Sequence, residues 1–150
     1  MLRHLGLELT NHCNLAGICR NCVNAYTTVP KGFASRDILE QTIEFSQPGQ
    51  IFQLHGLGEP LLHPEVVPFT ERVCQDDKAF YGSMSTNGLL LTQKMLRALL
   101  TAGLKELFIS LHVPASVDAL VRAVGYIEKH DSAVRLVATS FVGNTEVSEY

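Results

Sequence analysis

Three cysteines, Cys13, Cys19 and Cys22, lie close together in one segment near the start of the chain. Thiolates at this spacing are typical ligands of a metal ion or of an iron–sulfur cluster. Because iron–sulfur clusters usually take four cysteines, three of them would leave one iron with an open position for a substrate. The alternative is a structural zinc site in which His12 or His4 supplies the fourth ligand. The spacing alone leaves both interpretations open.

The sequence predicts a single globular domain, residues 1–150, that is located in the cytoplasm. Hydrophobic residues make up 46% of the chain and charged residues 18%, which argues against a disordered protein. The net charge is −3 and the sequence has no basic run, so nucleic acid is not expected as a partner. No apolar stretch approaches the ~20 residues that span a bilayer, and no signal peptide is apparent. Clustered cysteines in the cytosol are more often metal ligands than disulfides, whereas the separate Cys74 is expected to be a small buried hydrophobic residue.

The hydrophobic pattern predicts strands and helices in alternation. A short strand carries the chain into a long loop, residues 11–34, that contains the three cysteines. Ser35 and Thr92 are the expected N-caps of two helices. Strands are predicted at residues 3–10, 50–55, 80–86, 106–112 and 134–142. Helices are predicted between them, the first ending near residue 47, the second opening at Pro64, the third running from Thr92 to Gly103 and the fourth starting at Pro114.

Helices between successive strands imply right-handed crossovers and a parallel sheet. Ligands bind at the carboxyl ends of such strands, and every predicted strand ends in residues that could do chemistry. These are the cysteine loop, Gly56 to Pro60, Ser85 to Gly88, Ser110 to Pro114, and Val142 to Asn144. A complete eight-stranded barrel needs ~250 residues. The predicted fold class is therefore α/β, a partial (β/α) TIM-type barrel of about five parallel strands with outer helices, whose free edges a partner subunit, a second copy or further chain would cover.

The predicted strands are more polar than those of a sheet with helices on both faces. Polar residues that share one face of a strand are Gln53 with His55, Ser83 with Ser85, and Ser110 with His112. That face is expected to line a cavity rather than a packed core.

Four motifs follow one another on successive strand ends, and together they resemble those of the radical S-adenosylmethionine (radical SAM) enzymes. They are Thr10 to Leu15, Gly56 to Pro64, Ser85 to Gly88, and Ile109 to His112. The resemblance spans nearly the whole chain and is closest to the branch whose members often carry a C-terminal auxiliary-cluster domain. The chain departs from the commoner family pattern at three places. Five residues rather than three separate the first two cysteines, Asn21 stands where an aromatic residue often precedes the last cysteine, and Leu57 replaces the first glycine of Gly-Gly-Glu-Pro.

The resemblance implies two cofactors, a [4Fe–4S] cluster and S-adenosylmethionine. Cys13, Cys19 and Cys22 would bind the cluster, and S-adenosylmethionine would bind its fourth iron. One electron from a flavodoxin- or ferredoxin-like donor would cleave the sulfonium to methionine and a 5′-deoxyadenosyl radical, which removes a hydrogen atom from the substrate. The residues that match the family's cofactor contacts are Gly56, Gly58, Glu59, Ser85, Asn87, Ser110 and His112. Among them, the glycines would let the backbone approach the methionine end, and Glu59 would support its ammonium group.

The first functional hypothesis is a radical SAM enzyme that acts on a peptide or protein, as in peptide maturation. It rests on the wide lateral opening expected of an open arc of strands. The second is a radical SAM enzyme that acts on a small metabolite or cofactor precursor. The third is a non-enzymatic metal-binding module that keeps the scaffold and has lost turnover. The sequence does not assign a catalytic residue beyond the cofactor contacts.

Overall fold

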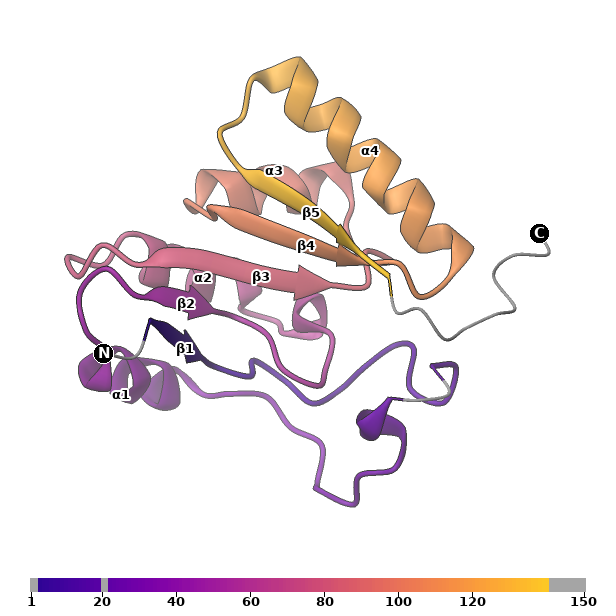
Figure 1. The fold of residues 1–150 in the computed structure, drawn as a ribbon. Helices are drawn as coiled ribbons and strands as arrows, with labels where there is room; N and C mark the ends of the chain where they lie inside the picture. The colour runs from indigo at the N-terminus through magenta and orange to yellow at the C-terminus, as the bar shows by residue number, and fades with distance from the viewer. Residues whose placement is uncertain (1–2, 20–21, 141–150) are drawn as a thin grey trace.

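The computed structural model describes residues 3–19 and 22–140. They form one parallel sheet with the strand order β1-β2-β3-β4-β5 (Figure 1). The strands are β1 (His4–Gly6), β2 (Ile51–Gln53), β3 (Tyr81–Thr86), β4 (Glu106–Ser110) and β5 (Arg135–Thr139). The helices are α1 (Arg36–Phe45), α2 (Val66–Cys74), α3 (Gln93–Thr101) and α4 (Pro114–His130), with the short 3-10 turns η1 (Val23–Ala25) and η2 (Pro60–Leu62). The predicted alternation of strands and helices in a partial barrel is confirmed.

Two helices begin at the predicted caps. The Ser35 hydroxyl accepts a hydrogen bond from the backbone N–H of Ile38 at 3.3 Å, and the Thr92 hydroxyl accepts one from Met95 at 3.1 Å. Each bond satisfies one of the backbone donors that a helix leaves free at its first turn. The second helix differs from the prediction, because α2 begins at Val66 and the residues before it form the separate turn η2.

The first strand is shorter than predicted. It ends at Gly6, although the N–H of Leu7 still donates to the carbonyl of Gln53 at 2.9 Å. Thr10 instead forms an isolated antiparallel bridge with Phe33, which closes the base of the cysteine loop. The chain therefore leaves the sheet earlier than the alternation of leucines predicts. The predicted end of the fifth strand, Val142 to Asn144, lies outside the described residues.

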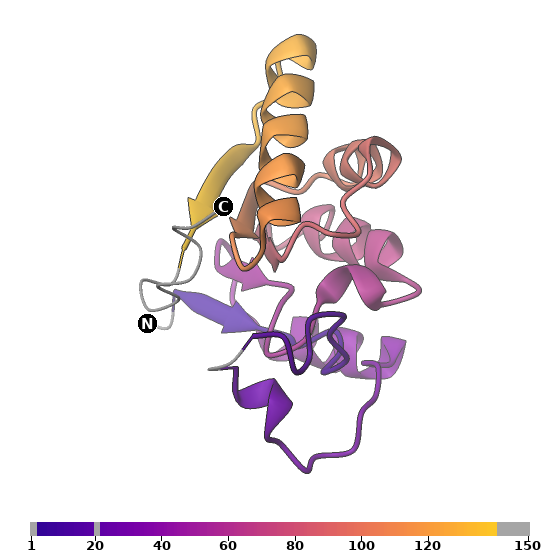
Figure 2. The ribbon, with the colours of Figure 1, turned by 90° about the vertical axis from the view of Figure 1, so that its right-hand side faces the viewer.

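All four helices lie on one face of the sheet (Figure 2). The core between the helices and the sheet contains large side chains that are almost wholly buried: Leu9, Phe52, Leu54, Phe69, Met84, Leu96, Leu99, Leu107 and Ile109. Burial of an apolar side chain of this size contributes about 1.5–3 kcal/mol. This core fixes the strands in register and therefore fixes where their carboxyl ends lie.

The other face of the sheet carries the predicted polar side chains of β3, and also Phe108 of β4, which pairs with Ser85. Because Gly82 of β3 faces Cys74 of α2, the neighbouring Ser83 and Ser85 point to the face without helices. The Ser83 hydroxyl donates to the carboxylate of Glu106 on β4 at 3.1 Å. Burial raises the pKa of the Cys74 thiol to about 11, so this cysteine is a neutral packing residue at physiological pH.

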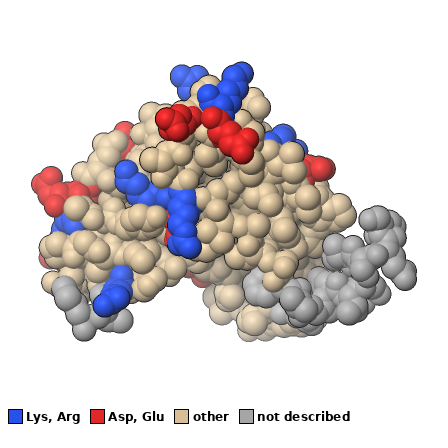
Figure 3. Space-filling view, turned by 45° about the horizontal axis from the view of Figure 1, so that its top comes forward, with Lys and Arg blue, Asp and Glu red and all other residues tan. Residues whose placement is uncertain are grey.

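Two further features of the described part of the chain are the length of its helices and the charge of its surface. None of its helices is both long and apolar enough to cross a membrane. On the face shown in Figure 3, acidic side chains lie beside basic ones at the top, and a small group of basic side chains lies near the centre.

Candidate functional site

The cysteine loop lies against the carboxyl ends of β2 and β3, on the side to which the strand arrows point (Figure 1). The backbone N–H of Glu59, after β2, donates to the carbonyl of His12 at 2.8 Å. The side-chain amide of Asn87, after β3, donates to the side-chain carbonyl of Asn14 at 2.7 Å. These contacts bring together segments that are far apart in the sequence, and they place the cysteines beside the predicted motifs of two strands.

A buried asparagine completes the attachment of the loop. The side-chain amide of Asn24, which is 3% exposed, donates to the carbonyl of Asn11 at 2.9 Å and to that of Leu57 at 2.8 Å. Asn11 in turn accepts a hydrogen bond from the N–H of Gly32 at 2.8 Å. The sequence alone does not mark Asn24 as a site residue. The only signal was a polar residue shortly after the last cysteine, in a loop whose carbonyl groups need donors.

The three thiols lie close enough to influence one another. Burial raises the pKa of Cys19, and the neighbouring Cys22 and Cys13 raise it further. Burial also raises the pKa of Cys13, and the carboxylate of Glu59 adds to that increase. The three cysteines and Glu59 of the Gly-Glu-Pro motif therefore lie in one site.

Three thiols on one loop are a donor set for a metal group. In the described parts of the chain, no three Cys, His, Asp or Glu side chains already surround one point as a single metal ion would require. A [4Fe–4S] cluster spreads its thiolates over different irons, so it does not require them to converge on one ion. The donor set, three soft thiols on one loop, fits such a cluster.

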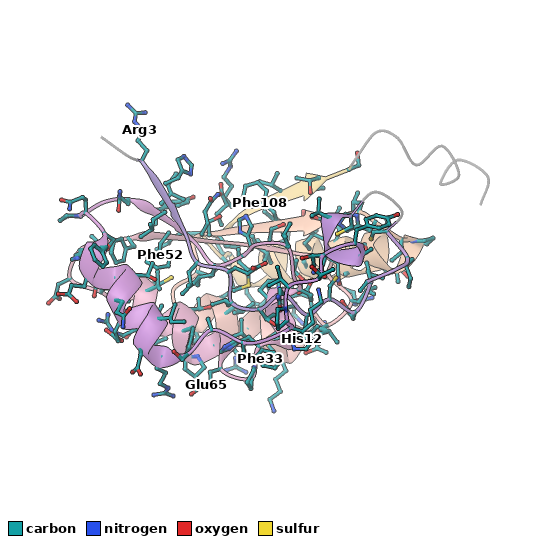
Figure 4. The ribbon with its side chains drawn as sticks, turned by 90° about the horizontal axis from the view of Figure 1, so that it is seen from below. Arg3, His12, Phe33, Phe52, Glu65 and Phe108 are labelled. Atoms are coloured by element: carbon teal, nitrogen blue, oxygen red, sulfur yellow. The ribbon has the colours of Figure 1, made fainter. Side chains whose placement is uncertain are left out.

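The two histidines considered as zinc ligands, His12 and His4, pack against another side chain or lie away from the cysteines. The ring of His12 stacks on Phe33 with 4.8 Å between ring centroids, and Figure 4 shows the two side by side. His4 begins β1 and therefore lies toward the amino end of the sheet, away from the cysteine loop. These positions do not support the zinc interpretation.

Glu59 is a buried carboxylate that joins the ends of β2 and β3. It is 2% exposed, and its oxygens accept hydrogen bonds from the Thr86 hydroxyl at 2.6 Å, the Asn87 N–H at 2.8 Å and the Leu61 N–H at 3.0 Å. Burial raises the pKa of Glu59, and the three donors oppose that increase. A carboxylate has about four acceptor positions. The protein uses three, which leaves one for the ammonium group that the resemblance predicts as its partner.

Glu59→Ala is expected to destabilise the fold by about 3 kcal/mol or more, because three buried donors lose their acceptor. Urea unfolding followed by circular dichroism measures this change in the free energy of unfolding. Glu128→Ala, at an exposed position of α4, is the matched control and should change it by less than ~0.5 kcal/mol. Equal stability of the two variants would show that the Glu59 network does not hold the strand ends together.

The polar residues at the ends of β3, β4 and β5 form a row. The hydroxyl of Ser110 lies 3.4 Å from that of Ser85 and 3.2 Å from that of Thr139. The backbone N–H of His112 donates to the carbonyl of Ser110 at 3.0 Å, and burial lowers the pKa of the His112 ring. The structure thus brings Ser85 and Ser110 into contact, with His112 directly after them.

His55 follows β2 and, by alternation, shares the polar face with Gln53. Its Nδ1 atom is buried and has no hydrogen-bond partner among the described residues. Burial lowers the pKa of His55, so the ring is neutral at physiological pH. A buried nitrogen without a partner can accept a hydrogen bond from a bound molecule or donate one to it.

Protonation of His55 should destabilise the fold. Because its folded pKa is below the ordinary value of 6.5, the unfolded chain binds the proton more tightly, and stability is lost as the pH falls from that value towards the folded pKa. His55→Gln should therefore reduce the loss of unfolding free energy in urea titrations run between about pH 7 and pH 5. Some loss remains, because the pKa of His112 is also lowered. His4→Gln, at an exposed position, is the control, and an identical pH dependence in both variants would contradict the assignment.

The glycines of the second motif pack against the chain that leads into the cysteine loop. A Cβ on Gly56 would lie 2.7 Å from the Cβ of Glu8, and one on Gly58 would lie 1.9 Å from the carbonyl oxygen of Thr10. Close packing of two loops is therefore one reason for glycine here, beside the predicted approach to S-adenosylmethionine. Asn21, the departure from the family pattern near the last cysteine, lies outside the described residues.

Comparison with known proteins identifies the family. The profile of the Radical SAM superfamily matches residues 7–145. A tungsten-containing aldehyde ferredoxin oxidoreductase cofactor-modifying protein from Pyrococcus furiosus is 30% identical over 130 residues, which are 84% of this chain and 35% of that protein. The chain thus spans about a third of the length of that relative.

Two solved structures share the fold. BtrN in complex with AdoMet and 2-DOIA has a TM-score of 0.75 and 18% identity, with 97% of this chain and 59% of that chain covered. Native anSMEcpe with bound AdoMet and Kp18Cys peptide has a TM-score of 0.64 and 18% identity, with 90% and 42% covered. The match over most of the sequence decides the assignment. The chain belongs to the radical SAM superfamily, whose members use a [4Fe–4S] cluster and S-adenosylmethionine.

Proposed function

We propose that residues 1–150 act as one radical SAM core, in which Cys13, Cys19 and Cys22 hold the cluster. The observation that carries this proposal is the attachment of the cysteine loop to the ends of β2 and β3 through the contacts of His12 and Asn14. When bound, the cluster supplies one electron that cleaves S-adenosylmethionine to methionine and a 5′-deoxyadenosyl radical. The chain's own residues position these cofactors and surround the radical.

The residues around the loop have separate roles in this proposal. Glu59 offers its remaining acceptor position to the ammonium group of S-adenosylmethionine. Ser85, Ser110 and His112 face the polar side of the sheet and contact the carboxylate or the ribose. Asn87, Gly56 and Gly58 hold the cysteine loop close to the ends of β2 and β3, where these cofactor contacts would form.

We propose a small metabolite or cofactor precursor as the substrate that loses a hydrogen atom to the radical. The relative from Pyrococcus furiosus is named for cofactor modification, and the BtrN structure contains the small molecule 2-DOIA. A peptide or protein substrate is the second candidate, supported by the peptide in the anSMEcpe structure and by the open edges at β1 and β5. A flavodoxin- or ferredoxin-like donor supplies the electron, and a partner subunit, a second copy or further chain covers the edges.

The experiment is anaerobic reconstitution with iron and sulfide, followed by reduction with dithionite in the presence of S-adenosylmethionine. Chromatography should detect 5′-deoxyadenosine and methionine in equal amounts. Candidate small molecules and peptides are then added, and the true substrate class should accelerate formation of 5′-deoxyadenosine. A brown, reduced protein that forms no 5′-deoxyadenosine would exclude the enzyme and favour a binding module.

A further inference from the structure

Lys31 joins the segments that flank the three cysteines within the cysteine loop. Its ammonium group donates to the backbone carbonyl of Asn11 at 3.0 Å and to that of Asn24 at 3.4 Å, and it also contacts the side-chain carbonyl of Asn24. Asn11 lies two residues before the first cysteine, and Asn24 lies two residues after the last. One ammonium group therefore holds together the segments that enter and leave the three cysteines. We call Asn24 and Lys31 the clasp.

The charge of Lys31 is not neutralised by its contacts. Within residues 3–19 and 22–140, its hydrogen bonds go to carbonyl oxygens and none to a carboxylate. Its contacts with Asn11 and Asn24, each two residues from a cysteine, place this positive charge beside the segment that carries the three thiols.

A positive charge beside the cysteines changes the free energy of any bound group whose own charge changes. Addition of one electron, from a low-potential one-electron donor, makes a bound cluster one unit more negative. A fixed positive charge nearby stabilises the more negative state, and no proton or bond is exchanged at the ammonium group.

We propose that Lys31 is a positioning residue that closes the cysteine loop and, through its charge, favours reduction of the cluster held there. This inference rests on the proposed function for the presence of the cluster. Closure of the loop is a property of the protein without the cluster. Asn24 contributes to closure but carries no charge, so substitutions at the two positions separate the two effects.

The test uses Lys31→Met, Lys31→Gln, Lys31→Arg and Asn24→Ala, with Lys94→Met on α3 as the matched control. The first readout is the redox titration of the reconstituted protein, followed by electron paramagnetic resonance. At a fixed ambient potential, the ratio of reduced to oxidised cluster should fall roughly fivefold in the Met and Gln variants, the scale of one partly screened charge. It should stay near the wild-type value in Lys31→Arg, Asn24→Ala and Lys94→Met.

The second readout is amide hydrogen exchange of residues 11–19 and 22–24 in the protein before reconstitution. Exchange should become severalfold faster in Lys31→Met and Asn24→Ala, and it should not change in Lys94→Met. An unchanged redox ratio in both uncharged variants would overturn the role of the charge, and unchanged exchange would overturn the closure. Failure of the wild-type protein to take up a cluster would instead contradict the proposed function, and the exchange experiment would still test the clasp.

Discussion

Replacement of any one of Cys13, Cys19 and Cys22 by serine is expected to abolish formation of 5′-deoxyadenosine, with a fall of at least ~100-fold. Loss of a residue that merely supports a metal ligand costs about 10–100-fold, and these residues are the proposed ligands themselves. The iron content and the visible absorbance of the reconstituted variants should fall in parallel. Product formation is measured under anaerobic conditions with dithionite as the reductant.

Cys74→Ser is the matched control, because this thiol packs against Gly82 on the helix-covered face and is not part of the loop. It should keep the iron content of the wild-type protein and its product formation. The circular dichroism spectra of all four variants should show that the sheet and helices persist. Normal product formation by any one of the three loop variants would remove that cysteine from the ligand set.

Gly58→Ala is expected to destabilise the protein by about 3 kcal/mol or more and to reduce product formation strongly. The new Cβ would lie 1.9 Å from the carbonyl oxygen of Thr10 and 2.7 Å from that of His12. Because these are backbone atoms, the loops must separate, which breaks the bond between Glu59 and His12. Strain of this kind is among the few causes of a very large loss of unfolding free energy from a single substitution. Urea unfolding and the 5′-deoxyadenosine assay, at a temperature where the variant is folded, measure the two effects.

Gly32→Ala provides the comparison within the same loop. No atom lies within 4 Å of the position that its Cβ would take, and Gly32 contributes only its backbone N–H to the hydrogen bond with the side-chain carbonyl of Asn11. Its effect on stability should stay within ~0.5 kcal/mol. If Gly58→Ala were as mild as Gly32→Ala, the contact between the two loops would not be needed for the site.

The order of the elements could be predicted because local signals mark them. Ser35 and Thr92 are caps whose side chains satisfy backbone donors only a few residues away, so a sequence pattern is sufficient. The polar face also follows from period-two alternation, which separates Ser83 and Ser85 from Met84.

The buried face of α4 could not be predicted from its apolar residues. Val117 and Val121 keep helical spacing but are 44% and 65% exposed, whereas Ser116, Ala119 and Ala123 face the interior. The small residues have an equally periodic spacing, and they pack where the helix comes close to the sheet. A Cβ on Gly88, for example, would lie 2.8 Å from that of Ala119. Periodicity identifies a helix but does not decide between two faces when the closer one requires small side chains.

The contacts that build the site could not be predicted because they join residues far apart in the sequence. Asn87 donates a hydrogen bond to Asn14, and Lys31 donates one to Asn11. No local sequence pattern predicts either partner. The end of β1 depends in the same way on the bridge between Thr10 and Phe33. The motifs predicted which strand ends carry the chemistry, and the hydrogen bonds between them determine how the loop is held.

The central claim is that three cysteines hold a cluster whose fourth iron is open to S-adenosylmethionine. Electron paramagnetic resonance of the dithionite-reduced protein, recorded with and without S-adenosylmethionine, tests it directly. Coordination of the open iron predicts a changed spectrum of the reduced cluster when S-adenosylmethionine is added. A reduced cluster whose spectrum is identical in both samples at saturating S-adenosylmethionine would contradict the claim.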